Sequence, residues 1–531
     1  MGSAGPAIVY RRYRAPTEHG ETFADPPLAE VPHLIATNRD RRLQYPCCLA
    51  YESPSEAAIG VRRELIQLAS DYTRQYRDVS LSALQAADPT ILMAGHQPQL
   101  FHPGVWYKNF ELSRLATRLG AVAVNLIVDN DVVGHWSIRV PAGSIEHPHI
   151  ENVAIDTPAQ QIPFEDHEIQ DRTLFNSFSD RVQEHLRPFV RNPLLRKWWP
   201  SVQQAADRDA NLGRTLARAR HQLEGQWGLQ TLELPLSRIC ETTAFRRWMM
   251  HILLELQRFQ AVYNSTLQEY RRVNHVRSRA HPAPELLADG EWLEAPFWLW
   301  TTDRPHRGRL FVRQRAGQLE LTDRNDLNFA IPFSESEPIS SAVDGLAALA
   351  RAGVKVRPRA LTTTLYARLC LCDLFIHGIG GGKYDQLTDA LMQKFFSVTP
   401  PHFLVLTATV KLPIESPRVN PSELRRVDSL LREFEHNPDR HVDVTHLSRP
   451  MVEAKQRWLT APQSAGKSRH DGIRQLNRDL QPFVARQRME LLAQRDRLST
   501  LTRNDRLLGA RDYAFCLFPE STLQALLLDK R

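Results

Sequence analysis

The clearest pattern of apolar and polar positions lies around residue 100. Apolar runs over 90–94 and 121–128 flank a segment, 105–119, in which apolar residues recur at helical spacing. The order strand, loop, helix, strand is typical of a βαβ unit in a parallel sheet. Because ligands of such sheets bind at the carboxyl ends of the strands, we expect the loops at 95–108 and 129–131 to meet there.

A second unit of the same kind is predicted further along the chain. The apolar run over 373–379 predicts a strand, the glycines at 380–382 a loop, and residues 384–396 a helix. A buried strand is expected over 403–410, and one long amphipathic helix over 243–271. The predicted fold class is α/β: a Rossmann-like parallel sheet core with helical insertions and a C-terminal antiparallel coiled-coil helical segment.

Changes in the pattern of apolar and polar residues predict that the chain is divided into four structural parts. After residue 417, two highly charged stretches each carry one apolar stripe, which favours an antiparallel helical hairpin. Pro482 lies within the second stretch and predicts a kink. The predicted parts are an N-terminal leader and helix at 1–85, a Rossmann-like core at 86–415 with a helical insertion at about 150–225 and a small β-sheet at 290–325, a coiled-coil hairpin at 416–505, and a tail at 506–531 that returns to the core.

Composition narrows the setting of the protein. The 531 residues include 67 Lys and Arg against 60 Asp and Glu, so the net charge of +7 is spread thinly. Basic residues alternate with acidic ones in the helical stretches, which disfavours nucleic acid as a partner. No apolar run reaches the roughly 18 residues that cross a bilayer, so no membrane association is expected. Six cysteines without a C-x-x-C pair favour the reducing cytoplasm.

The loop between the first predicted strand and helix carries the richest chemistry. It combines imidazole and amide side chains with backbone N–H groups at a helix amino terminus, where the helix dipole favours a phosphate or a carboxylate. The two aspartates after the next strand could hold Mg²⁺ or orient an amine. The alternative is that prolines and glycines shape a turn in which the histidines only cap the helix. The candidate catalytic residues are His96, Gln97, Lys108, Asp129 and Asp131, and the candidate nucleotide contacts are Gly95, His102 and Gly104.

The second glycine-rich segment is another candidate anion site, because adjacent glycines let the backbone approach a phosphate closely. It is not a P-loop, since His377 and Tyr384 occupy positions where that motif needs glycine and serine or threonine. No spacing matches a zinc signature, so no metal ligands are assigned. The acidic stretch 165–168 follows no predicted strand and is interpreted as solvated surface. The candidate nucleotide contacts here are Gly378, Gly380, Gly381, Gly382 and Lys383, and the candidate substrate contacts are Arg357, Arg359 and Asp385.

The order of these motifs resembles that of the bacillithiol biosynthesis cysteine-adding enzymes (BshC). The early signature of that family reads approximately G-Q-Q-x-G-L, then G-P-L-Y, then a lysine and a helix ending in Leu-Ala. An acidic cluster, an arginine-proline step before a glycine-rich loop, and a closing proline, leucine, glutamine pattern follow. The matching segments of this chain are 95–100, 103–108, 115–116, 129–132, 357–358 and 378–385, and the closing residues are Pro519, Leu523 and Gln524.

The resemblance implies a Rossmann-like core, binding of ATP or ADP, and a homodimer formed through the coiled coil. It also implies an ATP-dependent ligase-like activity that adds an amino acid, cysteine in that family, to an amino-sugar conjugate in the synthesis of a low-molecular-weight thiol. The alternative is a catalytically degenerate scaffold that assembles through its coiled coil. Asn130, which interrupts the acidic cluster, and the altered glycine-rich loop motivate this alternative.

Overall fold

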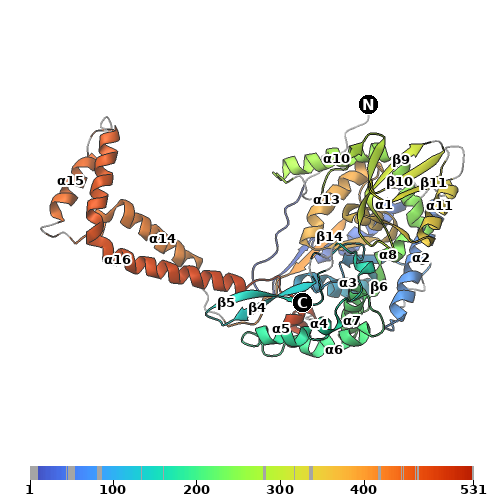
Figure 1. The fold of residues 1–531 in the computed structure, drawn as a ribbon, viewed down its shortest axis with the longest axis horizontal. Helices are drawn as coiled ribbons and strands as arrows, with labels where there is room; N and C mark the ends of the chain where they lie inside the picture. The colour runs from blue at the N-terminus through green and yellow to red at the C-terminus, as the bar shows by residue number, and fades with distance from the viewer. Residues whose placement is uncertain are drawn as a thin grey trace.

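The fold is an α/β body from which a helical arm projects (Figure 1). Parts of the predicted segments, among them residues 1–9 of the leader and 416–419 before the arm, lie outside the described residues. The computed structural model describes residues 10–43, 45, 54–79, 86–132, 134, 136–158, 161–278, 283–315, 317–333, 339–415, 420–443, 445, 448–460, 462 and 466–528.

A six-stranded sheet forms the centre of the body, and five of its strands are parallel. The parallel strands are largely buried, as expected of a sheet that helices cover on both faces. In spatial order the strands are β1 (Thr22–Asp25), β14 (Phe403–Ala408), β13 (Leu374–His377), β2 (Ile91–His96), β3 (Val122–Ile127) and β6 (Leu232–Pro235), with β1 antiparallel at the edge.

The order of the strands reverses between β2 and β13. The chain proceeds from β2 through β3 to β6 on one side, and then returns to add β13 and β14 on the other side of β2. Ile376 pairs with Ala94, so the two strands lie side by side in parallel. The loops that follow them therefore diverge and leave a crevice at their carboxyl ends.

The helix predicted after the glycines begins earlier than expected. Helix α13 spans Ile379–Lys394, so the glycines predicted to form a loop lie in its first turn, with Gly378 as the N-cap. The prediction was wrong because glycines were interpreted as helix breakers, whereas here they permit close packing. A Cβ atom built on Gly382 would lie 2.5 Å from Cγ2 of Val405 on β14.

The remaining helices of the body surround the sheet (Figure 1). The helix expected over 243–271 is two helices, because the backbone of Glu255 leaves the helical region at φ −107° and ψ 28°. Helix α12 continues as a π-helical turn, Ala367–Leu371. The bounds are α1 Val31–Leu43, α2 Pro54–Arg74, α3 Pro103–Leu119, α8 Leu236–Cys240, α9 Thr243–Leu254, α10 Leu256–Val273, α11 Ile339–Arg351, α12 Ala360–Tyr366 and α17 Glu520–Leu527.

Two smaller β-structures and a helical insertion complete the body. The predicted small antiparallel sheet is present, and it also recruits a strand from residues 354–358. The insertion predicted to be helical begins with a hairpin. The sheet contains β7 Ala288–Asp289, β8 Trp292–Thr301, β9 Gly308–Arg315, β10 Gln318–Thr322, β11 Asn328–Pro332 and β12 Val354–Pro358; the insertion contains β4 Ser137–Gly143, β5 Pro148–Ala154, α4 Arg172–Asn176, α5 Phe178–Leu186, α6 Leu194–Ala206 and α7 Leu212–Gln226.

The arm contains three helices where the sequence predicts a hairpin of two. Helices α14 (Pro421–His436) and α15 (Arg449–Thr460) both pack on the 43-residue helix α16 (Gly466–Leu508). Helix α16 contains Pro482 and bends partway along its length (Figure 1). Phe434, Val442, Leu480 and Val484 form a small apolar core, and Met451 and Val452 of α15 pack against it. None of the described helices has the length and apolarity needed to span a membrane.

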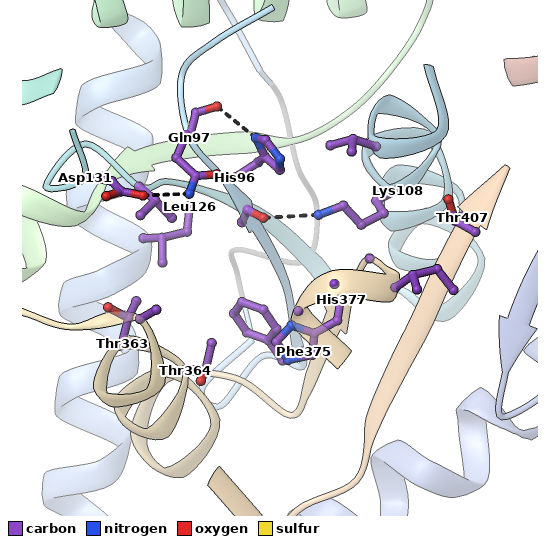
Figure 2. Close-up of a pocket in the computed structure, with 18 of the residues that line it drawn as sticks. His96, Gln97, Lys108, Leu126, Asp131, Thr363, Thr364, Phe375, His377 and Thr407 are labelled. Atoms are coloured by element: carbon purple, nitrogen blue, oxygen red, sulfur yellow. Dashed lines mark hydrogen bonds between the residues drawn. The ribbon is translucent and has the colours of Figure 1, made fainter. Parts of the chain in front are cut away.

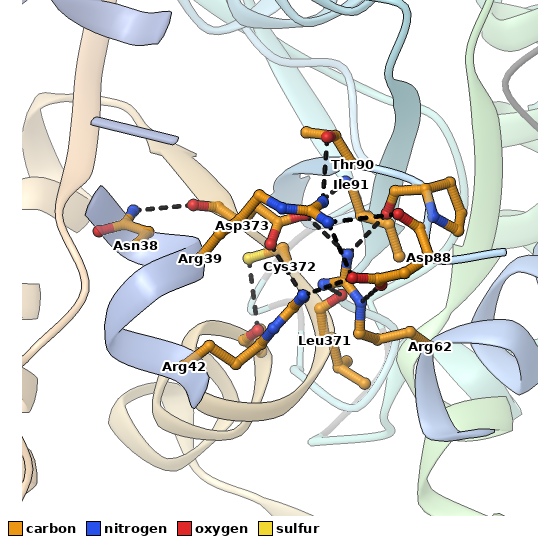
Figure 3. A network of polar contacts seen from close by, with 12 residues as sticks. Asn38, Arg39, Arg42, Arg62, Asp88, Thr90, Ile91, Leu371, Cys372 and Asp373 are labelled. Carbon is orange, nitrogen blue, oxygen red and sulfur yellow. Dashed lines mark hydrogen bonds and ion pairs between the residues drawn. The ribbon is translucent and has the colours of Figure 1, made fainter. Parts of the chain in front are cut away.

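A buried ionic network fixes the opposite edge of the sheet, where the parallel strands begin (Figure 3). Asp373, just before β13, accepts hydrogen bonds from Arg42 (2.9 Å), from Arg62 (2.7 Å) and from the backbone N–H of Ile91 (2.9 Å). Asp88, before β2, pairs with the same two arginines. Because the arginines lie on α1 and α2, the network attaches these N-terminal helices to the amino ends of β2 and β13.

Candidate functional site

A cavity of about 650 Å³ opens at the carboxyl ends of β2 and β13 (Figure 2). Its walls come from α3, α12, α13, the small antiparallel sheet and the C-terminal tail. The residues that line it are Ala15, Gly95, His96, Gln97, His102, Gly104, Val105, Lys108, Leu126, Val128, Asn130, Asp131, Trp298, Arg307, Pro358, Ala360, Thr363, Thr364, Phe375, His377, Gly378, Ile379, Gly380, Gly381, Thr407 and Arg511.

The cavity brings together residues from both predicted loops. The expectation that the two turns meet at one edge of the sheet is therefore confirmed. The predicted site residues that line the cavity are Gly95, His96, Gln97, His102, Gly104, Lys108, Asp131, Gly378, Gly380 and Gly381.

Lys108 is the central cation of the cavity. It lies in the second turn of α3, is 3% exposed, and donates a hydrogen bond from Nζ to the carbonyl of Gly95 at 3.1 Å (Figure 2). Among the described residues, no carboxylate lies within ion-pairing distance of this amine. Burial alone lowers the pKa of Lys108 to about 8. The positive charge of Lys108 is therefore buried, and no anionic side chain among the described residues balances it.

The first turn of α13 supplies hydrogen-bond donors opposite this lysine. Within the helix, the first backbone N–H to find an acceptor is that of Gly382, which donates to the carbonyl of Gly378 at 2.9 Å. The N–H groups of Ile379, Gly380 and Gly381 precede it, so they lack helical acceptors. A Cβ atom built on Gly378 would lie 3.9 Å from Cδ of Lys108, which places the helix terminus next to the lysine.

The opposite wall is built around Asp131. Its carboxylate accepts hydrogen bonds from Gln97 Nε2 at 2.9 Å and from Arg307 Nη1 at 3.0 Å (Figure 2 shows the Gln97 contact). The Arg307 guanidinium lies over the ring of Trp298, 4.2 Å from its centroid. The sequence did not identify Arg307 or Trp298, because nothing near residue 300 indicates that the small antiparallel sheet packs against this edge.

The two predicted histidines of the first loop have local structural partners. His102 is the N-cap of α3 and accepts a hydrogen bond from the N–H of Gly104 at 3.1 Å, while His96 Nδ1 lies 3.1 Å from the carbonyl of Gln97. Burial lowers the pKa of His96 to about 3 and that of His102 to about 4. Both rings are therefore neutral at pH 7, and the capping alternative describes His102.

Gly104 is fixed by packing of α3 against β14. A Cβ atom there would lie 2.2 Å from the carbonyl oxygen of Ala408. Glycine is thus needed for the close approach of the two backbones, in addition to any contact with a ligand.

Six predicted site residues lie outside the lining of the cavity. Asp129 points to α8, where Ser237 donates to it from its backbone N–H at 2.9 Å and from its hydroxyl at 2.5 Å. Burial, together with the nearby Glu165, raises the pKa of Asp129 to about 7. The other five are Gly382, Lys383, Arg357, Arg359 and Asp385.

The two predicted substrate arginines already have carboxylate partners in the fold. Arg357 binds both oxygens of Glu165, at 3.0 and 3.1 Å, and Arg359 binds Glu294 at 2.6 Å. These buried pairs connect the small sheet to neighbouring elements, so the arginines are positioned as structural residues. The acidic stretch 165–168, interpreted as solvated surface, was misjudged in part: Glu165 pairs with Arg357 and Lys355, Asp166 pairs with Lys355, and His167 is buried, whereas Glu168 is exposed.

One buried group of possible metal ligands lies away from the cavity. Donor atoms of His221, Glu224 and Glu233 lie within 4.8 Å of one another. Arg220 forms ion pairs with both carboxylates. A guanidinium therefore already neutralises the charge that would attract a cation, and we assign no metal to this group.

Comparison with known proteins adds no family. No protein-family model matches the chain, and no curated protein matches it significantly. The function must therefore be argued from the cavity itself.

Proposed function

We propose that the cavity binds the phosphates of ATP and that the protein is an ATP-dependent ligase-like enzyme. The observation that carries this proposal is the buried ammonium of Lys108, which has no carboxylate partner within the described ranges and lies beside the first-turn N–H groups of α13. A helix amino terminus and an adjacent lysine are a common combination for binding phosphate. Arg511, which also lines the cavity without an ion-pair partner among the described residues, adds positive charge.

We further propose that the central sheet is a Rossmann-like core. Numbered by their order in the chain, the five parallel strands stand in the spatial order 3-2-1-4-5, which is the order of dinucleotide-binding folds. In such folds the ligand lies where the strand order reverses, and the cavity opens at that point, between β2 and β13.

The resemblance to the cysteine-adding enzymes suggests the reaction. ATP would activate a carboxyl group, and the amine of an amino-sugar conjugate would then attack it to form an amide. Asp131 is the carboxylate among the described residues that line the cavity; because Arg307 already pairs with it, we propose that it orients the attacking amine, and we assign no Mg²⁺ to it. Gln97, which Asp131 orients, would contact the phosphate or the developing oxyanion.

Isothermal titration calorimetry with ATP and ADP tests the nucleotide site. We expect the wild-type protein to bind and Lys108→Met to lose at least tenfold in affinity, about 1.4 kcal/mol. Lys383→Met is the matched control, because this lysine lies on α13 outside the cavity and should bind ATP as the wild type does. Absence of binding to the wild type, or equal affinity in all three proteins, would refute the proposal.

A ligation assay tests the substrates. The purified protein is incubated with ATP, cysteine and glucosaminyl-malate, and the product is sought by mass spectrometry. Formation of the amide with release of ADP or AMP is the expected result. If ATP binds but no product forms, the proposed nucleotide site would stand and the assigned substrates would be wrong.

A further inference from the structure

His377 has a defined position in the cavity that the proposed function does not yet use. It is the last residue of β13 and lines the cavity below Lys108 (Figure 2). Its Nε2 atom lies 2.9 Å from Oδ2 of Asp385, one of the predicted substrate contacts. Among the described residues, no carboxylate forms a hydrogen bond with the ring of His96 or of His102. Of the three cavity histidines, His377 is therefore the one whose ring orientation the fold controls most strongly.

Asp385 is held as an anion by its own neighbours. Arg368, on the π-helical turn, donates to it at 2.6 Å, and the hydroxyl of Thr364 donates at 2.5 Å. Although burial opposes ionisation, Arg368 and His377 hold the pKa of Asp385 well below its usual range. An ionised carboxylate only accepts hydrogen bonds, so Nε2 of His377 must carry the proton.

The other ring nitrogen faces the open side. With the proton on Nε2, Nδ1 of His377 keeps its lone pair, and within the described parts of the chain it has no hydrogen-bond partner. A Cβ atom built on Gly381 would lie 2.9 Å from Nδ1, so the missing side chain at this glycine leaves the nitrogen uncovered. Gly381 itself lines the cavity.

We propose that His377 is the general base of the cavity and that Asp385 and Arg368 are its positioning residues. This assignment rests on the proposed ligase function for the identity of the nucleophile. As the carbon–nitrogen bond forms, Nδ1 accepts the proton that the attacking amine loses. The carbon–oxygen bond to the phosphate breaks at the same centre, and the phosphate leaves with the electron pair.

The charges around the ring favour the neutral, basic form at pH 7. Burial, Arg368 and Lys108 lower the pKa of His377, and Asp385 raises it without reversing the shift. The remaining neighbours are the rings of Phe375 and Phe403, which carry no charge. The ring is therefore ready to accept a proton, as a general base requires.

Acylation by diethyl pyrocarbonate tests the exposed nitrogen without any nucleotide. The reagent attacks the unprotonated nitrogen of a neutral imidazole, and the tryptic peptide 369–383 contains a single histidine, His377. We expect this peptide to be modified in the native protein at pH 7. Gly381→Ala should slow the modification at least fivefold, because its methyl group covers Nδ1.

Paired aspartate variants test the positioning. Asp385→Asn should slow the modification at least threefold, because the ring loses the anion that fixes its proton on Nε2. Asp389→Asn is the matched control: Asp389 also binds Arg368, at 2.6 Å, one turn further along α13. In this control variant, His377 should be modified at the wild-type rate. An unmodified His377 in the native protein, or equal rates in wild type, Gly381→Ala and Asp385→Asn, would overturn the inference.

The kinetics of the His377→Gln variant distinguish a general base from a residue with only a structural role. In the ligation assay, His377→Gln should lower kcat by 10²-fold or more, keep the Kd for ATP within twofold, and remove the decline of kcat toward acid pH. Lost ATP affinity with unchanged kcat would contradict the assignment. Because ATP binding and acylation are measured separately, a failure of the nucleotide site is distinguishable from a failure of the base.

Discussion

At the scale of single residues, Lys108 carries a cost in stability that the proposed binding site would explain. An ammonium buried without an anionic partner costs free energy in the folded protein, and burial is the cause of its lowered pKa. An anionic ligand would supply the missing partner. A role in a ligand-binding site therefore explains this buried lysine better than a role in the hydrophobic core does.

Replacing Lys108 should make the protein more stable. At pH 7 the folded state bears the cost of the buried charge, and a pKa lowered from 10.5 to about 8 corresponds to about 3 kcal/mol. Lys108→Met should raise the free energy of unfolding by up to that amount at pH 7. The gain should shrink as the pH rises from 8 to 10.5, because the folded wild type then holds a neutral amine while the unfolded chain still binds the proton.

Urea unfolding at pH 7 and pH 10 checks this prediction. Lys383→Met provides the comparison, since its side chain is only half-buried on α13 and should change stability by less than about 0.5 kcal/mol. A destabilised Lys108→Met protein at pH 7 would mean that the amine has an anionic partner in the fold, in addition to the carbonyl of Gly95.

At the scale of elements, α13 begins directly at the end of β13 because its first turn consists of glycines. The three glycines are not equivalent. A Cβ atom on Gly380 would meet nothing within 4 Å, whereas one on Gly382 would lie 2.5 Å from Val405. Gly382 thus sets the distance between the helix and β14, and Gly380 does not.

Two alanine variants distinguish these roles. Gly382→Ala should destabilise the protein by about 1–3 kcal/mol, because the methyl group overlaps a core side chain. Gly380→Ala should be neutral or stabilising by about 0.5 kcal/mol, because alanine favours helix formation. Thermal unfolding of both variants tests the pair, and equal effects would indicate that the helix can shift away from β14.

At the scale of the whole molecule, the two edges of the sheet have different tasks. The carboxyl edge holds the cavity, while the amino edge is closed by the arginine and aspartate network of Figure 3. Asp373 is fully buried there and binds arginines from two N-terminal helices. The ionic network and the proposed binding site therefore lie at opposite ends of the same strands.

Removing one carboxylate from the network should reveal this separation. Asp373→Asn removes the carboxylate that pairs with the buried arginines, so it should lower the free energy of unfolding by about 3–5 kcal/mol. Asp71→Asn, which removes an exposed carboxylate on α2, should cost less than about 0.5 kcal/mol. Below its unfolding temperature, Asp373→Asn should still bind ATP with near wild-type affinity; a large loss would show that the two edges are coupled.

The arm gives a second prediction at this scale. We propose that it mediates self-association, because α16 extends beyond the body and leaves residues 485–490 exposed, including Met489 at 65%. Sedimentation should give twice the chain mass of 60.8 kDa. Met489→Glu should weaken the association at least tenfold without changing the circular dichroism spectrum. A wild-type protein that sediments as a monomer at every concentration would contradict the proposal.

The amino-acid sequence alone was enough to predict the central strands and the meeting of two loops. Apolar runs such as 121–128 are local and strong, and each ends at polar or glycine residues. Because parallel strands share their carboxyl edge, the loops after β2 and β3 could be placed together before any coordinates were known. His377 lay inside the strand predicted over 373–379 and was not among the candidate site residues.

Which charged side chains are free to bind a ligand could be seen in the tertiary structure alone. Arg357 and Arg359 resemble ligand-binding residues in the sequence, but Glu165 and Glu294 neutralise them from segments far along the chain. In the part of the chain that the structure describes, Lys108 has no such partner, although its immediate sequence differs little from that of an exposed helix lysine. Ion pairing depends on contacts between distant segments, and local patterns carry no information about those contacts until the chain has folded.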